Sequence, residues 1–311
     1  MNGHHIKRRT VLTAIAATLL VTPLVTTNTV TAQAASVKPS ASVLKKSNSY
    51  YRKHAKALGK QYKFAYSAQT ALKKNGKAVV WVNTKDTKLK QSVKLAMDYW
   101  NHKLGKKEFT QGTKKNHTLT FSVSNAKPSK NDTSDAWWTP GTKKVQVRKY
   151  YYDQTTQDIG EAMTTHLNNA FYKKYAATVE AKAKALLASQ GVATTDKDYT
   201  QKFNETASNV ETSLPAYQTL ETQVAAVRNS VAEQGRMYEY ASTIAHEFGH
   251  VMGLNHSPNK TDLMYFESGT SRVNSYSQVT SKTGLKTYNP VTATDKARAQ
   301  LALKIYVAKQ K

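Results

Sequence analysis

Cysteine is absent from this chain of 311 residues. Its absence excludes a disulfide, a cysteine-ligated zinc and a cysteine nucleophile. Acidic residues are scarce: 20 Asp and Glu stand against 46 Lys and Arg, so the formal net charge is +26. A field of this size attracts anionic partners over long distances, although the same charge is also compatible with nothing more than a solvated surface.

Long apolar runs are missing beyond the N-terminus, so no later segment is expected to cross a membrane. At the N-terminus three basic residues precede the run VLTAIAATLLVTPLV, and small residues follow at Ala32 and Ala34. This pattern predicts a secretory signal peptide over residues 1–34. A membrane anchor is the alternative, but the run is short for a span and Pro23 interrupts it. We therefore expect a secreted, extracellular protein, and the lack of cysteine favours a Gram-positive cell surface.

The segment 35–76 carries ten Lys or Arg and no Asp or Glu. It could be a propeptide, a wall-binding tail or a flexible leader, and YYRKHAKALGKQYK favours a short basic helix. We expect the segment to hold the protein at anionic cell-wall polymers through attraction that weakens with salt. It offers no thiolate or carboxylate to block a metal, so activity should not require its removal. Nucleic acid is not an expected partner, because no recognition motif is present.

Elements of both kinds follow along the chain. Leu89, Val93, Met97, Trp100 and Leu104 recur at helical spacing between a capping Asp86 and a terminating Gly105. The expected elements are strands over 77–84 and 117–124, a helix over 87–104, a hairpin over 136–152 turning at Pro140 and Gly141, and a closing helix over 292–311. This order indicates an α+β or α/β fold.

A helical insert is expected over about 154–235. That window has nine acidic and seven basic residues, unlike the basic remainder of the chain. Apolar residues recur every four positions from Ile159 to Tyr175, Gly191 ends that helix, and a second apolar series runs from Leu220 to Val231. A coiled-coil surface for a partner is the alternative. The insert would interrupt a domain spanning 77–311.

The stretch HEFGHVMGLNH carries the chemistry. His246 and His250 are four residues apart, so on a helix they project from one face and can reach one zinc ion. Glu247 can act as general base towards a water whose pKa the zinc lowers. Gly253 can adopt the left-handed conformation that ends the helix, after which His256 returns as third ligand. Three protein ligands and one open position are typical of a catalytic zinc.

This stretch fits every fixed position of His-Glu-x-x-His-x-x-Gly-x-x-His and resembles the metzincin metalloproteases. HSPNKTDLMY, with Met264 eight residues after His256, is similar to the matrixin branch. The resemblance implies an α+β catalytic domain with a twisted mixed sheet, a backing helix, an active-site helix and a C-terminal helix. It implies one catalytic Zn²⁺, a structural Met-turn at Met264, and protein or peptide substrates. The segment TKKVQVR, 142–148, would be the edge strand that aligns substrate by adding a strand to the sheet.

Several features depart from that pattern. The matrixin propeptide cysteine is missing, and no calcium-binding or structural-zinc loop is recognisable, although calcium is compatible with the resemblance. We interpret His54, His102, His117 and His166 as non-ligands. Tyr265 follows Met264 directly, one residue earlier than the metal-binding tyrosine of astacins, and is not assigned to zinc.

Two functions from different classes follow. The first is a secreted zinc endopeptidase, and the second is a cationic cell-envelope binding protein whose protease fold is idle. Retention of Glu247 beside the three histidines favours the enzyme, because an idle fold has no need of a general base. Specificity is expected to reside in the loop after Met264, FESGTSRVNSYSQ, and the substrate itself cannot be read from sequence.

Overall fold

The computed structural model describes residues 37–267, 269–281 and 288–311. The predicted signal peptide over 1–34 lies outside these residues. Two compact units are present: the larger takes in the described residues of 37–170 and 220–311, and the smaller takes in 171–219.

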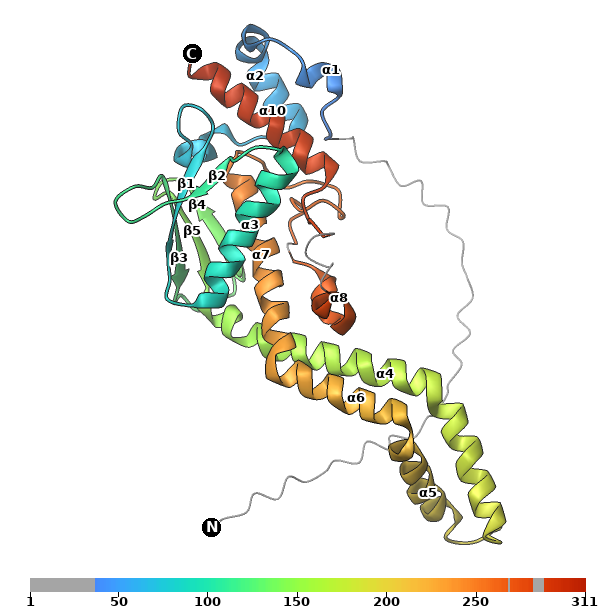
Figure 1. Ribbon diagram of the computed structural model, residues 1–311. Coiled ribbons are helices and arrows are strands. Elements are labelled where there is room, and N and C mark those ends of the chain that lie inside the picture. The colour runs from blue at the N-terminus through green and yellow to red at the C-terminus, as the bar shows by residue number, and fades with distance from the viewer. Residues whose placement is uncertain (1–36, 268, 282–287) are drawn as a thin grey trace. The chain divides into compact units, whose positions relative to one another are not determined.

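The larger unit is built on a five-stranded mixed sheet (Figure 1). The strand order is β2-β1-β3-β5-β4; β4 runs antiparallel to β5, and the other neighbours are parallel. The strands are β1 Ala78–Asn83, β2 Phe109–Gln111, β3 Leu119–Ser124, β4 Ala136–Thr139 and β5 Lys144–Arg148. The predicted strands over 77–84 and 117–124 are thereby confirmed. The hairpin predicted over 136–152 is confirmed up to Arg148, whereas residues 149–152 belong to a helix. Strand β2 was not predicted, because three residues carry no periodic signal.

The predicted edge strand is wrong. β5, which contains most of 142–148, lies between β3 and β4, and its Val145 and Val147 are fully buried. The edges of the sheet are β2 and β4, each of which has a bonded neighbour on one side only. A hairpin pattern predicts that two strands pair, but it does not tell which of the two faces the rest of the sheet.

Two helices pack against each other beside the sheet (Figure 1). They are α3 Thr87–Leu104 and α7 Ala232–Val251. As predicted, the Asp86 carboxylate accepts from the Leu89 N–H at the start of α3, and Gly105 ends that helix with a φ of 70°. The indole N–H of Trp100 donates to the Ala245 carbonyl at 2.7 Å, and the Phe109 and Phe248 rings stack at 4.7 Å. These contacts fix the helix that carries the motif.

The N-terminal segment is part of the hydrophobic core. It forms α1 Ala41–Leu44, α2 Asn48–Tyr62 and a 3₁₀ helix, η1 Tyr66–Ala71. Helix α2 lies alongside the C-terminal helix α10, Ala293–Lys309, which confirms the predicted closing helix (Figure 1). The core includes several of its side chains, all less than a tenth exposed: Tyr51, Leu58, Tyr62, Phe64, Ala71 and Leu72. The domain core therefore continues across residue 76 without a break.

Backbone bonds join this segment to the end of the motif. Phe64 and Leu254 form an antiparallel bridge, in which the Ala65 N–H donates to the Gly253 carbonyl and the Asn255 N–H donates to the Lys63 carbonyl. The buried Arg298 of α10 donates to the carbonyls of Tyr62, Lys63 and Asn255. One guanidinium thus connects three stretches of chain.

Helices follow β5 directly, as the periodicity predicts. They are α4 Lys149–Ser189, α5 Tyr199–Ser213 and α6 Pro215–Ala226, and a π-helical turn over Val227–Val231 leads into α7. Within the larger unit, Ile159 and Met163 pack with Val227 and Val231. Within the smaller unit, Ala183, Leu187 and Val210 are buried. Gly191, with a φ of 73°, follows the end of α4. After the Met-turn come two short helices, η3 Ser271–Asn274 and α8 Tyr276–Thr280.

Candidate zinc site

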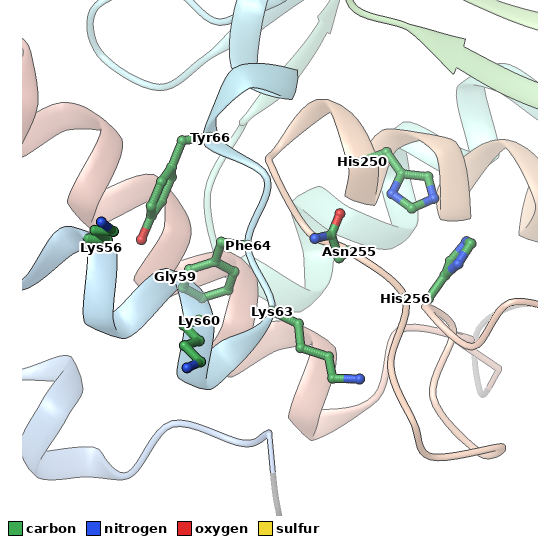
Figure 2. A pocket seen from close by; sticks show the side chains of 9 residues that line it. All are labelled: Lys56, Gly59, Lys60, Lys63, Phe64, Tyr66, His250, Asn255 and His256. Atoms are coloured by element: carbon green, nitrogen blue, oxygen red, sulfur yellow. The ribbon is translucent and has the colours of Figure 1, made fainter.

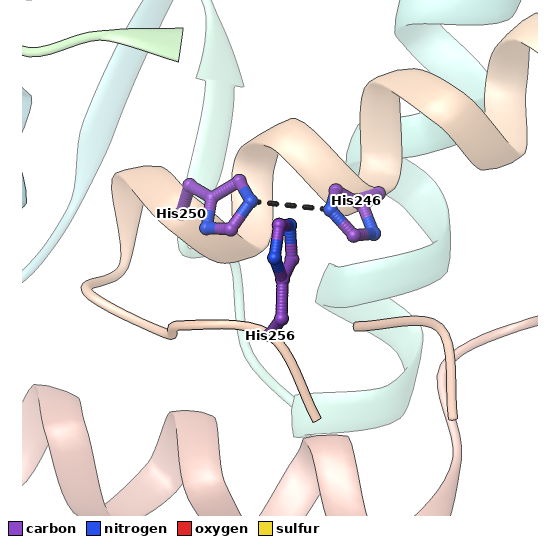
Figure 3. A group of neighbouring side chains, drawn as sticks. All are labelled: His246, His250 and His256. Atoms are coloured by element: carbon purple, nitrogen blue, oxygen red, sulfur yellow. Dashed lines mark hydrogen bonds between the residues drawn. The ribbon is translucent and has the colours of Figure 1, made fainter. Parts of the chain in front are cut away.

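Three histidine rings converge at the end of α7 (Figure 3). Their ring centroids lie 4.8 to 5.3 Å apart, and the Nε2 atoms of His246 and His250 are separated by 3.1 Å. A tetrahedral zinc with Zn–N bonds of about 2.0–2.1 Å places two ligand nitrogens about 3.4 Å apart. The spacing of these donors therefore fits a zinc ion.

Backbone carbonyls fix the tautomers of two ligands. The Nδ1–H of His246 donates to Leu263 at 2.7 Å, and the Nδ1–H of His250 donates to Leu254 at 2.6 Å. A carbonyl can only accept, so the proton resides on Nδ1 in each ring and the Nε2 lone pair is free. Two such lone pairs facing each other repel unless a cation lies between them.

Burial keeps the ligands neutral. Burial first, and the neighbouring imidazoles second, lower the pKa of His246 to about 3 and that of His250 to about 4. The pKa of His256 is also lowered, first by burial and then by Arg298. Neutral imidazole is the form that binds metal, so the set is ready to bind zinc at neutral pH.

A glycine turn delivers His256. The Leu254 N–H donates to the Gly249 carbonyl and the Gly253 N–H donates to the His250 carbonyl, and Gly253 has a φ of 88°. These two bonds form a Schellman motif, which needs a left-handed residue at this position. A Cβ on Gly253 would also meet the side chain of Gln69 at 2.8 Å. The turn thus stops α7 and sends the chain back towards the first two ligands.

Glu247 lies beside the edge strand. Its side chain is buried and accepts a hydrogen bond from the backbone N–H of Trp138 in β4. Burial raises the pKa of Glu247 to about 8, with a further contribution from Asp135, while the bond from Trp138 opposes the shift. A zinc ion nearby favours the carboxylate form, because its charge reverses the effect of burial.

Met264 lies against Gly249, which is between the first two histidines of the motif. It is fully buried, and a Cβ on Gly249 would come within 2.2 Å of its sulfur, so the glycine between the first two ligands allows this close approach. The Asp295 carboxylate accepts from the N–H groups of Leu263 and Met264 and so holds the turn. Asp295 is not among the residues predicted for the site. The signal that could have pointed to it is the capping-box spacing of Thr292 and Asp295 at the start of α10.

Within the described part of the chain, the three histidines are the one group of three or more His, Cys, Asp or Glu side chains whose ligand atoms converge. No helix among these residues is both long and apolar enough to traverse a bilayer.

A mixed sheet beside a helix bearing two histidines and a glutamate, with a third histidine after a glycine turn, defines a zinc metalloendopeptidase of the metzincin class. The family model for matrixin matches residues 79–280, and the chain belongs to this family. The predicted family, fold class, catalytic zinc and protease activity are thereby confirmed. A search of curated proteins and a search of solved structures each found no match.

Proposed function

We propose that His246, His250 and His256 hold a single Zn²⁺ and that Glu247 is the general base of peptide-bond hydrolysis. When bound, the metal supplies Lewis-acid activation of a water and of the scissile carbonyl. The chain's own residues supply the rest: neutral imidazoles of fixed tautomer, and a buried carboxylate that accepts the proton. The observation that carries the proposal is the convergence of the three ligand nitrogens, with Glu247 next to His246 on the same helix.

Substrate alignment is assigned to β4 in place of β5. An edge strand can pair with an extended peptide through its free backbone groups. The backbone of β4 at Trp138 lies next to Glu247, so a peptide pairing with the free groups of this edge would have its backbone near the general base. Met264 and Gly253 are given structural roles, as the buried floor and the helix-ending turn.

Replacement of His256 by alanine is expected to lower the zinc content of the purified protein sharply, because two ligands cannot complete a catalytic site. Zinc is measured by elemental analysis, and cleavage is followed with a peptide library and mass spectrometry. His102 is the matched control, since it is exposed on α3 and lies outside the metal cluster. Full zinc and full cleavage in His256→Ala would show that the third histidine is not a ligand.

We further propose that the protein is secreted and retained at anionic cell-wall polymers, with residues 35–76 contributing to retention. The net charge of +26 and the ten basic residues of that segment support this. Binding to a wall preparation should fall as salt rises from about 50 mM to about 500 mM, because screening shortens the reach of exposed charges. The bound fraction is measured by sedimenting the protein together with the wall preparation. A bound fraction that does not change with salt would contradict the proposal.

A further inference from the structure

A cavity of about 660 Å³ borders the metal site (Figure 2). Its wall includes two of the zinc ligands, His250 and His256, so an occupant lies next to the reacting centre. The opposite wall comes from α2 and its C-terminal cap, and it contributes Lys56, Lys60 and Lys63. This wall belongs to the N-terminal segment, which the zinc motif does not require.

The three lysines share one face of the chain. Lys56 and Lys60 are one helical turn apart, and Lys63 caps the helix with a left-handed backbone, φ 54°. All three side chains are exposed, and none takes part in an ion pair among the described residues. The cavity has no acidic residue in its lining, so its ammonium groups lack a counter-charge there.

The position of this charge is fixed by the fold. The carbonyl of Lys63 accepts from Asn255, the residue before His256, and from Arg298. Arg298 is fully buried behind the same turn, where the carboxylates of Asp262 and Asp295 counter its charge, so the three lysines supply the positive charge of the cavity itself. Phe64 and Tyr66 supply apolar surface to the same lining. A carboxylate on a short aliphatic stem matches both parts of this lining.

We propose that this cavity is a specificity subsite for an acidic side chain, Asp or Glu, of the peptide substrate, close to the scissile bond. The inference rests on the proposed protease function. A peptide fits better than a long polyanion, because the cavity shares His250 and His256 with the metal site. A substrate side chain in this cavity therefore belongs to a residue close to the scissile bond. A long polymer bound in the cavity would instead cover the zinc site.

The test uses pairs of fluorogenic peptides that differ only in Glu or Gln at each position flanking the cleaved bond. For one position, the wild-type protein should cleave the Glu peptide with a kcat/KM about tenfold higher, as two or three exposed ion pairs can supply. The triple variant Lys56→Gln, Lys60→Gln, Lys63→Gln should bring the Glu-to-Gln ratio close to one. Raising salt should lower the ratio of the wild-type protein as well.

Lys53→Gln is the matched control. Lys53 is exposed on the same helix, about 10 Å before Lys60, and lies outside the cavity lining, so the ratio should stay at its wild-type value. Both peptides of a pair are cleaved by the same protein sample. An inactive, unfolded fraction of a variant therefore lowers both kcat/KM values equally and leaves their ratio unchanged.

The outcomes separate the two proposals. Cleavage of no peptide by the zinc-loaded wild-type protein overturns the protease function itself. Cleavage without a Glu preference, or an equal loss in Lys53→Gln, overturns the subsite alone. If the triple variant loses binding to polyphosphate yet keeps the peptide ratio, the lysines form a polymer-docking surface and the subsite is likewise overturned.

Discussion

Replacing Glu247 by glutamine is expected to lower kcat/KM by roughly 10²–10⁴-fold, the usual contribution of a general base. Zinc content should stay at one per chain, because the three imidazoles are unchanged and glutamine keeps the shape of the side chain. The amide cannot accept the proton of the attacking water, whereas the buried carboxylate beside Trp138 can. Steady-state kinetics and elemental analysis on the same samples provide both readings.

Glu233→Gln is the control for this experiment. Glu233 lies in the first turn of the same helix, α7, and its half-exposed side chain pairs only with Lys88 and Arg236 at the surface. Loss of the Glu233 charge should leave kcat/KM close to the wild-type value. Near wild-type activity in Glu247→Gln would show that another group accepts the proton.

A chain that begins at Lys77 is expected to lose its cooperative fold, and with it zinc and activity. The deletion removes Tyr51, Leu58, Tyr62, Phe64 and Leu72 from the core, and it exposes the face of α10 that packs on α2. At about 2 kcal/mol for each buried side chain, the loss is roughly 10 kcal/mol. That equals the whole stability of a typical domain, about 5–15 kcal/mol. Thermal unfolding followed by circular dichroism, together with zinc content, measures the result.

The control is a chain that begins at residue 35, which keeps every described residue. It should unfold in one cooperative transition and cleave peptide. The sequence-based interpretation of 35–76 as a separable leader predicts instead that both chains cleave a small peptide equally well. Equal activity of the two chains would therefore contradict the role that the structure gives to α2.

Local signals explain what sequence reasoning could predict. The zinc motif lies within eleven residues, its helix ends at a glycine that must be left-handed, and α3 has a readable cap at both ends. Each of these depends on neighbours along the chain, so pattern and propensity suffice.

Long-range pairings explain what sequence reasoning missed. The hairpin of β4 and β5 can pair with β3 through either of its two strands. Nothing within the hairpin sequence tells that β5 is the strand that pairs. Lys63 and Arg298 are joined across 235 residues. The sequence predicts the basic helix of 35–76, but not the burial of its apolar face, because that face packs against α10, which lies far along the chain.

The bridge between Phe64 and Leu254 implies that proteolytic cleavage of the N-terminal segment would lower the activity of the enzyme. Residues 63–65 are hydrogen-bonded to the turn that positions His256. An ordered N-terminal segment should therefore raise the affinity for zinc, and bound zinc should in turn stabilise the segment. In a zymogen, a cut in the N-terminal segment releases an inhibitor and switches the enzyme on. Here, a cut between α2 and β1 would loosen a support of the third ligand, so trimming would switch the enzyme off.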